Sequence, residues 1–129
     1  MINSNFVVIF ASMKIIRNKY LPIGKNFWAI NILGIVFTKG KLSRISENHE
    51  YIHTLQQREM LFVFFYLWYI VEWIFRWIQF RDREKAYYHI SFEQEAYCNQ
   101  RNLLYPQQRI FFAWTKYLKR KRHKESRQL

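Results

Sequence analysis

Two histidines four residues apart, His49 and His53, enclose a glutamate, Glu50, directly after the first of them. On an α-helix, residues with this spacing lie on the same face, one turn above each other. Two imidazole nitrogens can then bind one tetrahedral zinc ion, and the glutamate faces the water on the metal as its general base. We therefore predict a hydrolytic zinc site, with His49 and His53 as metal ligands and Glu50 as the catalytic residue.

A zinc site of this type needs a third protein ligand, and Glu93 and Glu95 are the candidates. Both lie in the stretch "FEQEAY", on a helix expected to start near Ser91, because Ser91 and Gln94 have the spacing of a capping box. Two histidines and one carboxylate leave the fourth position of a tetrahedral zinc ion open for water, as hydrolysis requires.

The other two histidines are less suitable as ligands. His89 lies one helical turn before Glu93 and is either a supporting residue behind the ligands or an exposed side chain. His123 stands in a run of lysines and arginines, whose charges repel a cation.

Two motifs, "HEYIHTLQQ" and "EQEAY", together resemble the gluzincin pattern of membrane-associated zinc peptidases, which include the CAAX prenyl endopeptidases and the heat-shock membrane peptidases. The chain also resembles small bacterial membrane proteins of uncharacterised function that carry Asn-His-Glu-x-Ile-His-x-x-Gln-Gln and Phe-Glu-x-Glu-Ala-Tyr. The resemblance covers residues 46–100. It implies a zincin-like fold, Zn²⁺ as the cofactor, a peptide or protein substrate, and a location in a membrane, the bacterial inner membrane.

Position by position, the resemblance gives the His-Glu-x-x-His residues the roles stated above and assigns the third ligand. Glu93 takes that place, because Ala96 stands three residues after it as in the family, and Glu95 is the alternative. Tyr97 departs from the pattern, since the family has an aspartate there that helps to orient a ligand histidine. A phenol is a weaker acceptor for an imidazole N–H, so the departure bears on zinc affinity and catalytic strength.

The elements that must position these residues are expected to be mainly helical, because residues 41–105 contain no glycine or proline. Ser46 is the predicted N-cap of the histidine helix, with Glu47 in its first turn. Before it, "GIVFTKG" reads as a short strand, the edge along which an extended peptide would pair. We expect a mainly α fold, a small membrane-associated zincin-like helical domain over residues 1–118 with this short β edge strand, followed by a basic tail, residues 119–129.

The distance between the two motifs restricts the path of the chain. A straight helix from His53 to Phe80 would end about 40 Å from the zinc, and residues 81–91 return at most about 36 to 40 Å when fully extended. The site therefore predicts either a bend near "TLQQREM", residues 54–60, or an extended connector leading to a helix that starts near Ser91.

The most apolar segment is residues 61–80, long enough as a helix, at about 30 Å, to match a hydrocarbon core. Glu72 and Arg76 interrupt it with the spacing of an i,i+4 ion pair. We expect this segment to insert fully or partly into a membrane; the alternative is an amphipathic helix lying on a membrane or buried in a protein core. Residues typical of interfacial anchors lie within this segment and directly after it, namely Trp68, Trp73, Trp77, Arg81 and Arg83.

The composition fits a single small domain with a basic surface. The chain has 129 residues, and 21 Lys and Arg against 9 Asp and Glu give a formal charge of +12, which suits an anionic membrane or a nucleic acid. We expect membrane lipids as a partner and no specific nucleic acid. Two further hypotheses stay open: a zinc-binding membrane scaffold or sensor without catalysis, and a basic membrane-binding protein without metal.

Overall fold

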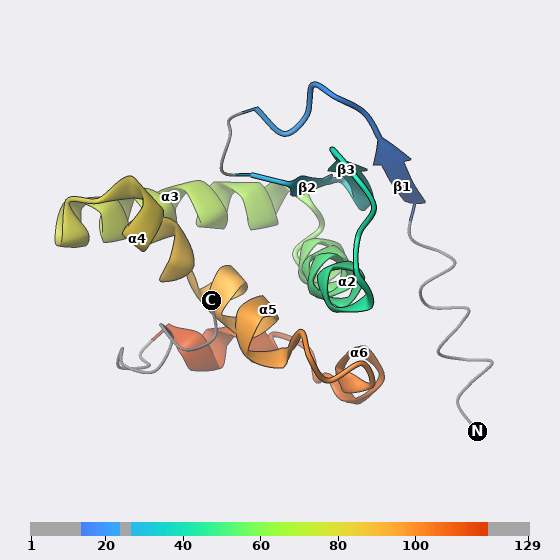
Figure 1. Cartoon of the computed structure of the whole chain (residues 1–129). Coiled ribbons are helices and arrows are strands. Elements are labelled where there is room, and N and C mark those ends of the chain that lie inside the picture. Colours follow the sequence, from blue (N-terminus) through green and yellow to red (C-terminus); the bar gives the residue numbers. More distant parts are fainter. Residues whose placement is uncertain (1–13, 24–26, 119–129) are drawn as a thin grey trace.

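The computed structural model describes residues 14–23 and 27–118, so the expected basic tail, residues 119–129, lies outside the described residues. The described chain is mainly helical, as predicted, and it contains a small three-stranded sheet where one short strand was expected (Figure 1). The elements in chain order are β1 (Lys14–Arg17), β2 (Ala29–Ile32), β3 (Ile35–Thr38), α2 (Arg44–Glu59), α3 (Val63–Phe80), α4 (Arg83–Tyr88), α5 (Ser91–Asn99), α6 (Tyr105–Gln108) and the short 3₁₀-helix η1 (Ala113–Tyr117).

The sheet has the strand order β1-β3-β2, with β1 parallel and β2 antiparallel to β3. A two-residue turn joins β2 to β3, and both of its residues, Leu33 and Gly34, have a positive φ, as the tightest hairpin turns require. The stretch "GIVFTKG" does form a strand, β3, but β3 is central. The prediction that it is the edge strand was therefore wrong, and β2 is the edge on the side of the histidine helix.

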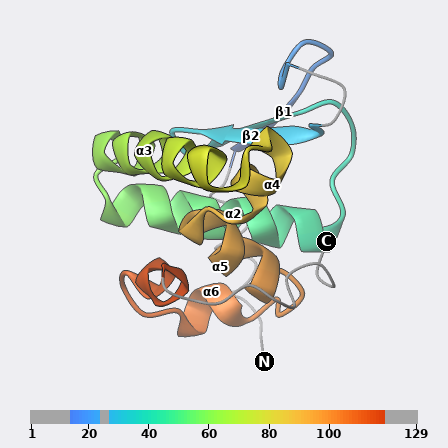
Figure 2. The ribbon, with the colours of Figure 1, turned by 90° about the vertical axis from the view of Figure 1, so that its left-hand side faces the viewer.

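Helix α2 begins earlier than the sequence suggested. The hydroxyl of Ser43 accepts the backbone N–H of Ser46 at 3.1 Å, so Ser43 is the N-cap and the predicted cap at Ser46 was wrong. Glu47 lies in the first turn, as expected for a carboxylate near the positive end of the helix dipole. In Figures 1 and 2 the sheet lies on one side of α2, and α5 with the C-terminal elements lies on the other.

Helices α2 and α3 meet at a sharp elbow, which confirms the bend predicted near residues 54–60. Their axes differ by 112° across a break of three residues. Leu61 and Phe62 in this break have positive φ values, 54° and 61°, which non-glycine residues rarely adopt and which cost about 1–3 kcal/mol each. The connector after α3 is not extended, because α4 occupies most of it, so the elbow alone brings the chain back to the histidines.

A buried carboxylate of α3 holds the start of α5. Glu72 accepts the backbone N–H of Ser91 at 2.9 Å and its hydroxyl at 2.6 Å. The predicted capping box between Ser91 and Gln94 was therefore wrong: Ser91 is the first residue of α5, and its hydroxyl is bonded to another helix. The predicted pair of Glu72 with Arg76 is present at 3.5 Å. Glu72 thus supplies the acceptors that the N-terminus of α5 lacks locally and fixes the start of the helix that carries Glu93.

Two small apolar clusters lie on either side of the polar interior. One joins the sheet to α2 and contains Val36, Leu42 and Tyr51. The other joins α3, α5 and the C-terminal segment and contains Phe65, Ile90, Phe92 and Trp114. Among the described residues, no single helix is long and apolar enough to cross a membrane. Helices α2 and α3 have the required length and apolar character only when they are taken together, and they are sharply bent at their elbow.

Candidate metal centre

The two histidines of α2 and Glu93 of α5 converge in the interior of the protein. The Nε2 atoms of His49 and His53 are 3.2 Å apart. Glu93 Oε1 lies 3.4 Å from His49 Nε2 and 3.2 Å from His53 Nε2. All three residues are at most 6 % exposed. The α2–α3 elbow and the Glu72 contact thus bring together three side chains that are up to 44 positions apart in the sequence.

These separations match the edges of a tetrahedral zinc site. Zinc binds imidazole nitrogen at about 2.0–2.1 Å and carboxylate oxygen at about 2.0–2.2 Å, which places neighbouring ligand atoms of a tetrahedron roughly 3.3–3.5 Å apart. The three observed distances run from 3.2 to 3.4 Å. The donor set and its spacing therefore fit one zinc ion with a fourth position left for water or substrate.

The hydrogen bonds of the two Nδ1 atoms determine which nitrogen of each imidazole carries the hydrogen and which one offers a lone pair. His49 Nδ1 lies 2.9 Å from Gln100 Oε1, and His53 Nδ1 lies 2.8 Å from Gln56 Oε1. The amide nitrogen of Gln56 donates to Glu95 Oε1 at 2.9 Å, so the amide oxygen faces the histidine. His53 Nδ1 must then carry the hydrogen, and His53 Nε2 points a lone pair at the carboxylate. The Gln100 oxygen that faces His49 Nδ1 favours the same tautomer for His49. Three acceptors at this distance require a cation or a proton between them.

The short distances between Glu93 and the two histidines shift the pKa values of Glu93 and His53. Burial by itself would lower the pKa of His53, but the adjacent Glu93 carboxylate outweighs burial and raises the pKa of His53 to about 9. Burial would also raise the pKa of Glu93, but the two histidines hold that pKa far below its usual range. In the metal-free protein a proton therefore occupies the place between His53 and Glu93, and a metal ion has to displace it.

Glu50 lies beside the ligand group, on the wall of a cavity that also exposes both histidines and Glu93. Burial raises the pKa of Glu50, while His49 and His53 oppose this rise. A carboxylate with a raised pKa can both accept and return a proton near neutral pH. The backbone of Glu50 is held as well, because its carbonyl accepts the side-chain amide of Asn31 at 2.8 Å.

Glu95, the alternative third ligand, turns away from the two Nε2 atoms. It is fully buried, and its carboxylate accepts from Tyr105 at 2.7 Å and from Arg109 at 2.5 Å. Through Gln56 it lies behind the outer nitrogen of His53. The structure therefore brings Glu93 to the histidines, whereas Glu95 supports one of them from behind.

The hydroxyl of Tyr97 and the Nδ1 of His89 have their hydrogen-bond partners outside the ligand group. The ring of Tyr97 packs against His49 with centroids 4.4 Å apart, and its hydroxyl lies 3.3 Å from that of Tyr87. The phenol thus takes no imidazole N–H in place of the family aspartate. His89 is half-buried: its Nδ1 lies 2.8 Å from the carbonyl of Lys85, so it does not belong to the ligand group. The position of His123 lies outside the described residues.

Three residues of the site were missed by the sequence reasoning. Gln56 and Gln100 orient the histidines, and Tyr69 donates its hydroxyl to Glu93 Oε2 at 2.8 Å. Gln56 could have been found, because it follows His53 by three residues and so lies on the same helix face. Gln100 and Tyr69 carry no signal in the sequence, since both reach the site only through the packing of helices.

The cavity at the site has a volume of about 1060 Å³. One wall is the edge strand β2, and another is the row of tyrosines Tyr66, Tyr69, Tyr87 and Tyr97. This size and lining suit a short stretch of peptide or a molecule of similar size.

No protein-family model, no curated protein and no solved structure matches this chain.

Proposed function

We propose that the protein is a zinc-dependent peptidase of a small zincin-like type. The observation that carries the proposal is the convergence of His49 Nε2, His53 Nε2 and Glu93 Oε1 at the spacing of tetrahedral zinc ligands, at the floor of an open cavity. Zinc held by two histidines and a carboxylate supplies a water of pKa near about 7 and polarises a carbonyl oxygen.

The residues of the chain have distinct tasks in this proposal. Glu50 takes a proton from the attacking water and passes it to the leaving nitrogen. Gln56 and Gln100 keep the hydrogens of the histidines on Nδ1, so that both lone pairs face inward. Tyr69 keeps its proton, because burial and Glu93 raise its pKa well above the usual value, and it orients the Glu93 carboxylate by donating to Oε2.

The substrate class follows from the wall of the cavity. Within the described part of the chain, strand β2 has one neighbour, β3, and its residues Ala29–Ile32 line the cavity beside the histidines. An extended peptide can add to such an edge and place one carbonyl over the site. The side chain of Asn31 and the amide of Gln57 hold β2 to α2, so this edge is fixed relative to Glu50 and the ligands.

Hydrolysis of a quenched fluorescent peptide library by the zinc-loaded protein tests the proposal. We expect turnover that disappears with a chelator, returns with zinc, and falls by at least about 100-fold in Glu50→Gln, since a general base contributes about 10²–10⁴-fold. Zinc content of the Glu50→Gln variant should equal that of the wild type, because Glu50 is not a ligand. Retained zinc with no turnover in the wild type would instead support the zinc-binding scaffold or sensor.

A further inference from the structure

Helix α3 has the opposite polarity to that of a helix on the surface of a soluble protein. Its two charged residues, Glu72 and Arg76, face the interior, where Glu72 is only 7 % exposed. Its outward face is apolar almost throughout. The large apolar side chains exposed there are Val63, Phe64, Leu67, Trp68, Ile70, Val71, Ile74, Phe75, Trp77 and Ile78.

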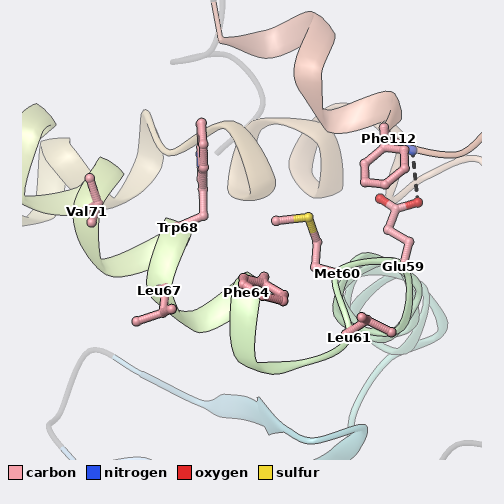
Figure 3. Close-up of a pocket in the computed structure, with 8 residues that line it drawn as sticks. All are labelled: Glu59, Met60, Leu61, Phe64, Leu67, Trp68, Val71 and Phe112. Carbon is pink, nitrogen blue, oxygen red and sulfur yellow. Dashed lines mark hydrogen bonds between the residues drawn. The ribbon is translucent and has the colours of Figure 1, made fainter.

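The apolar face continues beyond α3 across the elbow. A groove of about 480 Å³ lies between the first turns of α3 and the C-terminal segment, and Figure 3 shows Met60 inside it between Trp68 and Phe112. Ile110 and Phe111, next to Phe112, are 67 % and 80 % exposed. The groove and these residues therefore extend one continuous apolar surface, which is larger than the isolated apolar side chains normal on a protein surface.

The charge of the surface indicates what covers this face. Of the eight acidic residues in the described ranges, 14–23 and 27–118, five have side chains buried in the polar interior: Glu50, Glu59, Glu72, Glu93 and Glu95. This leaves three (8 − 5), Glu47, Asp82 and Glu84, against the 14 lysines and arginines of the same ranges, among which Arg109 has a buried side chain. The described surface is thus basic, and it complements an anionic lipid surface.

We propose that the outer face of α3 and residues 110–112 dock onto an anionic lipid bilayer, with α3 lying in the plane of the interface. An upright α3 is disfavoured because α4 runs back beside it and exposes Arg83, Glu84 and Lys85, which would be carried into the hydrocarbon. An apolar helix face on a protein with a basic surface is the arrangement by which interfacial helices bind anionic lipid. The proposal does not depend on zinc.

Flotation of the full chain with lipid vesicles tests this docking. We expect several-fold more protein to float with phosphatidylcholine vesicles containing one quarter phosphatidylglycerol than with phosphatidylcholine alone, and alkaline carbonate should release it. Leu67→Glu and Val71→Glu should each reduce the partition coefficient at least tenfold. Gln79→Glu, which adds the same charge to an exposed polar position of α3, should change it less than twofold. A chelator should leave all these values unchanged.

Three results would overturn the docking. One is equal flotation of the wild type and both glutamate variants. Another is resistance to carbonate, which would mean that α3 spans the bilayer. The third is a stable dimer in light scattering that ignores vesicles and dissociates in Leu67→Glu, which would show that a second copy of the chain covers the face. Circular dichroism should confirm that each variant keeps the helical content of the wild type.

Discussion

The inner face of α2 and the outer face of α3 reverse the usual rule of protein surfaces. The inner face of α2 is polar and buried: Asn48, His49, His53, Gln56 and Gln57 are each at most 6 % exposed. The outer face of α3 is apolar and exposed along its whole length. The two helices are joined by only three residues, so the sequence changes its polarity pattern at the elbow.

The difference shows what each face requires. Buried polar groups cost free energy unless they are hydrogen-bonded, and the polar groups of α2 bond in a dense network with α5 and β2. Such a network is less stabilising than an apolar core of the same size. We therefore explain the buried polar residues of α2 by the candidate metal site that they position. The exposed apolar face of α3 has the opposite requirement, since its contact with water costs free energy that a partner excluding water would remove.

The largest effect on the buried polar network is expected from removing its buried cation, Arg109. Arg109 binds both oxygens of Glu59, at 3.0 and 2.8 Å, and both oxygens of Glu95, with all three side chains at most 4 % exposed. Arg109→Met would leave two buried carboxylates without a counterion. We expect a loss of about 3–5 kcal/mol in the free energy of unfolding, measured by urea denaturation.

The matched control is Arg101→Met, at an exposed arginine. It should change the free energy of unfolding by less than about 0.5 kcal/mol. Equal losses for the two variants would mean that the buried ion cluster does not support the fold.

Glu72, on the inward side of α3, links this helix to the start of α5 and so to the polar interior. Glu72→Gln keeps the volume but loses the charge and one acceptor for Ser91. Because hydrogen bonds to a charged group contribute about 1.5–3 kcal/mol, we expect a loss of about 2 kcal/mol in urea denaturation. Glu84→Gln, at an exposed glutamate, should cost less than about 1 kcal/mol; a loss as large as that of Glu72→Gln would remove the role given to Glu72.

The orientation of the histidines can be tested without touching a ligand. Gln56→Leu removes the oxygen that faces His53 Nδ1. Loss of such a partner lowers metal affinity by about 10–100-fold, and we expect this range in a competition titration with a zinc chelator dye. Gln107→Leu, at an exposed glutamine, should keep the wild-type affinity. If both variants bind zinc equally well, the glutamine does not position the ligand.

The pH dependence should have opposite signs in the metal-free and zinc-loaded protein. The pKa of His53 rises from 6.5 to about 9 on folding, so its contribution to metal-free stability is complete below pH 6.5 and is lost as the pH rises through about 9. Zinc affinity should instead rise over this range, because zinc displaces that proton. Calorimetry in buffers of different ionisation enthalpy should give about one proton released per zinc at pH 7; a value of zero would show that His53 is not displaced.

Much of the fold could be predicted from the sequence, and the errors have local causes. The absence of glycine and proline over residues 41–105 indicated the helices. The distance between the motifs required either a bend or an extended connector, and the structure has the bend. The caps at Ser46 and Ser91 were misplaced because another serine, Ser43, lies within capping distance and because Glu72 reaches Ser91 from α3. No local pattern reveals an acceptor from a distant helix.

The site was predictable where its residues share one helix or one motif. His49, Glu50 and His53 follow from the helical period, and Glu93 from the resemblance to the gluzincin pattern. Residues that reach the site through packing could not be derived. Tyr69 lies in an apolar segment, where an aromatic ring is expected, and its bond to Glu93 depends on the path of the elbow.

The central claim is that His49, His53 and Glu93 bind one zinc ion. Its most direct test is the zinc content per chain after purification and dialysis, for the wild type, His53→Ala and His89→Ala. We predict about one zinc in the wild type and in His89→Ala, whose histidine lies away from the site, and almost none in His53→Ala. Equal zinc in all three proteins, or no zinc in the wild type after incubation with excess metal, would contradict the claim.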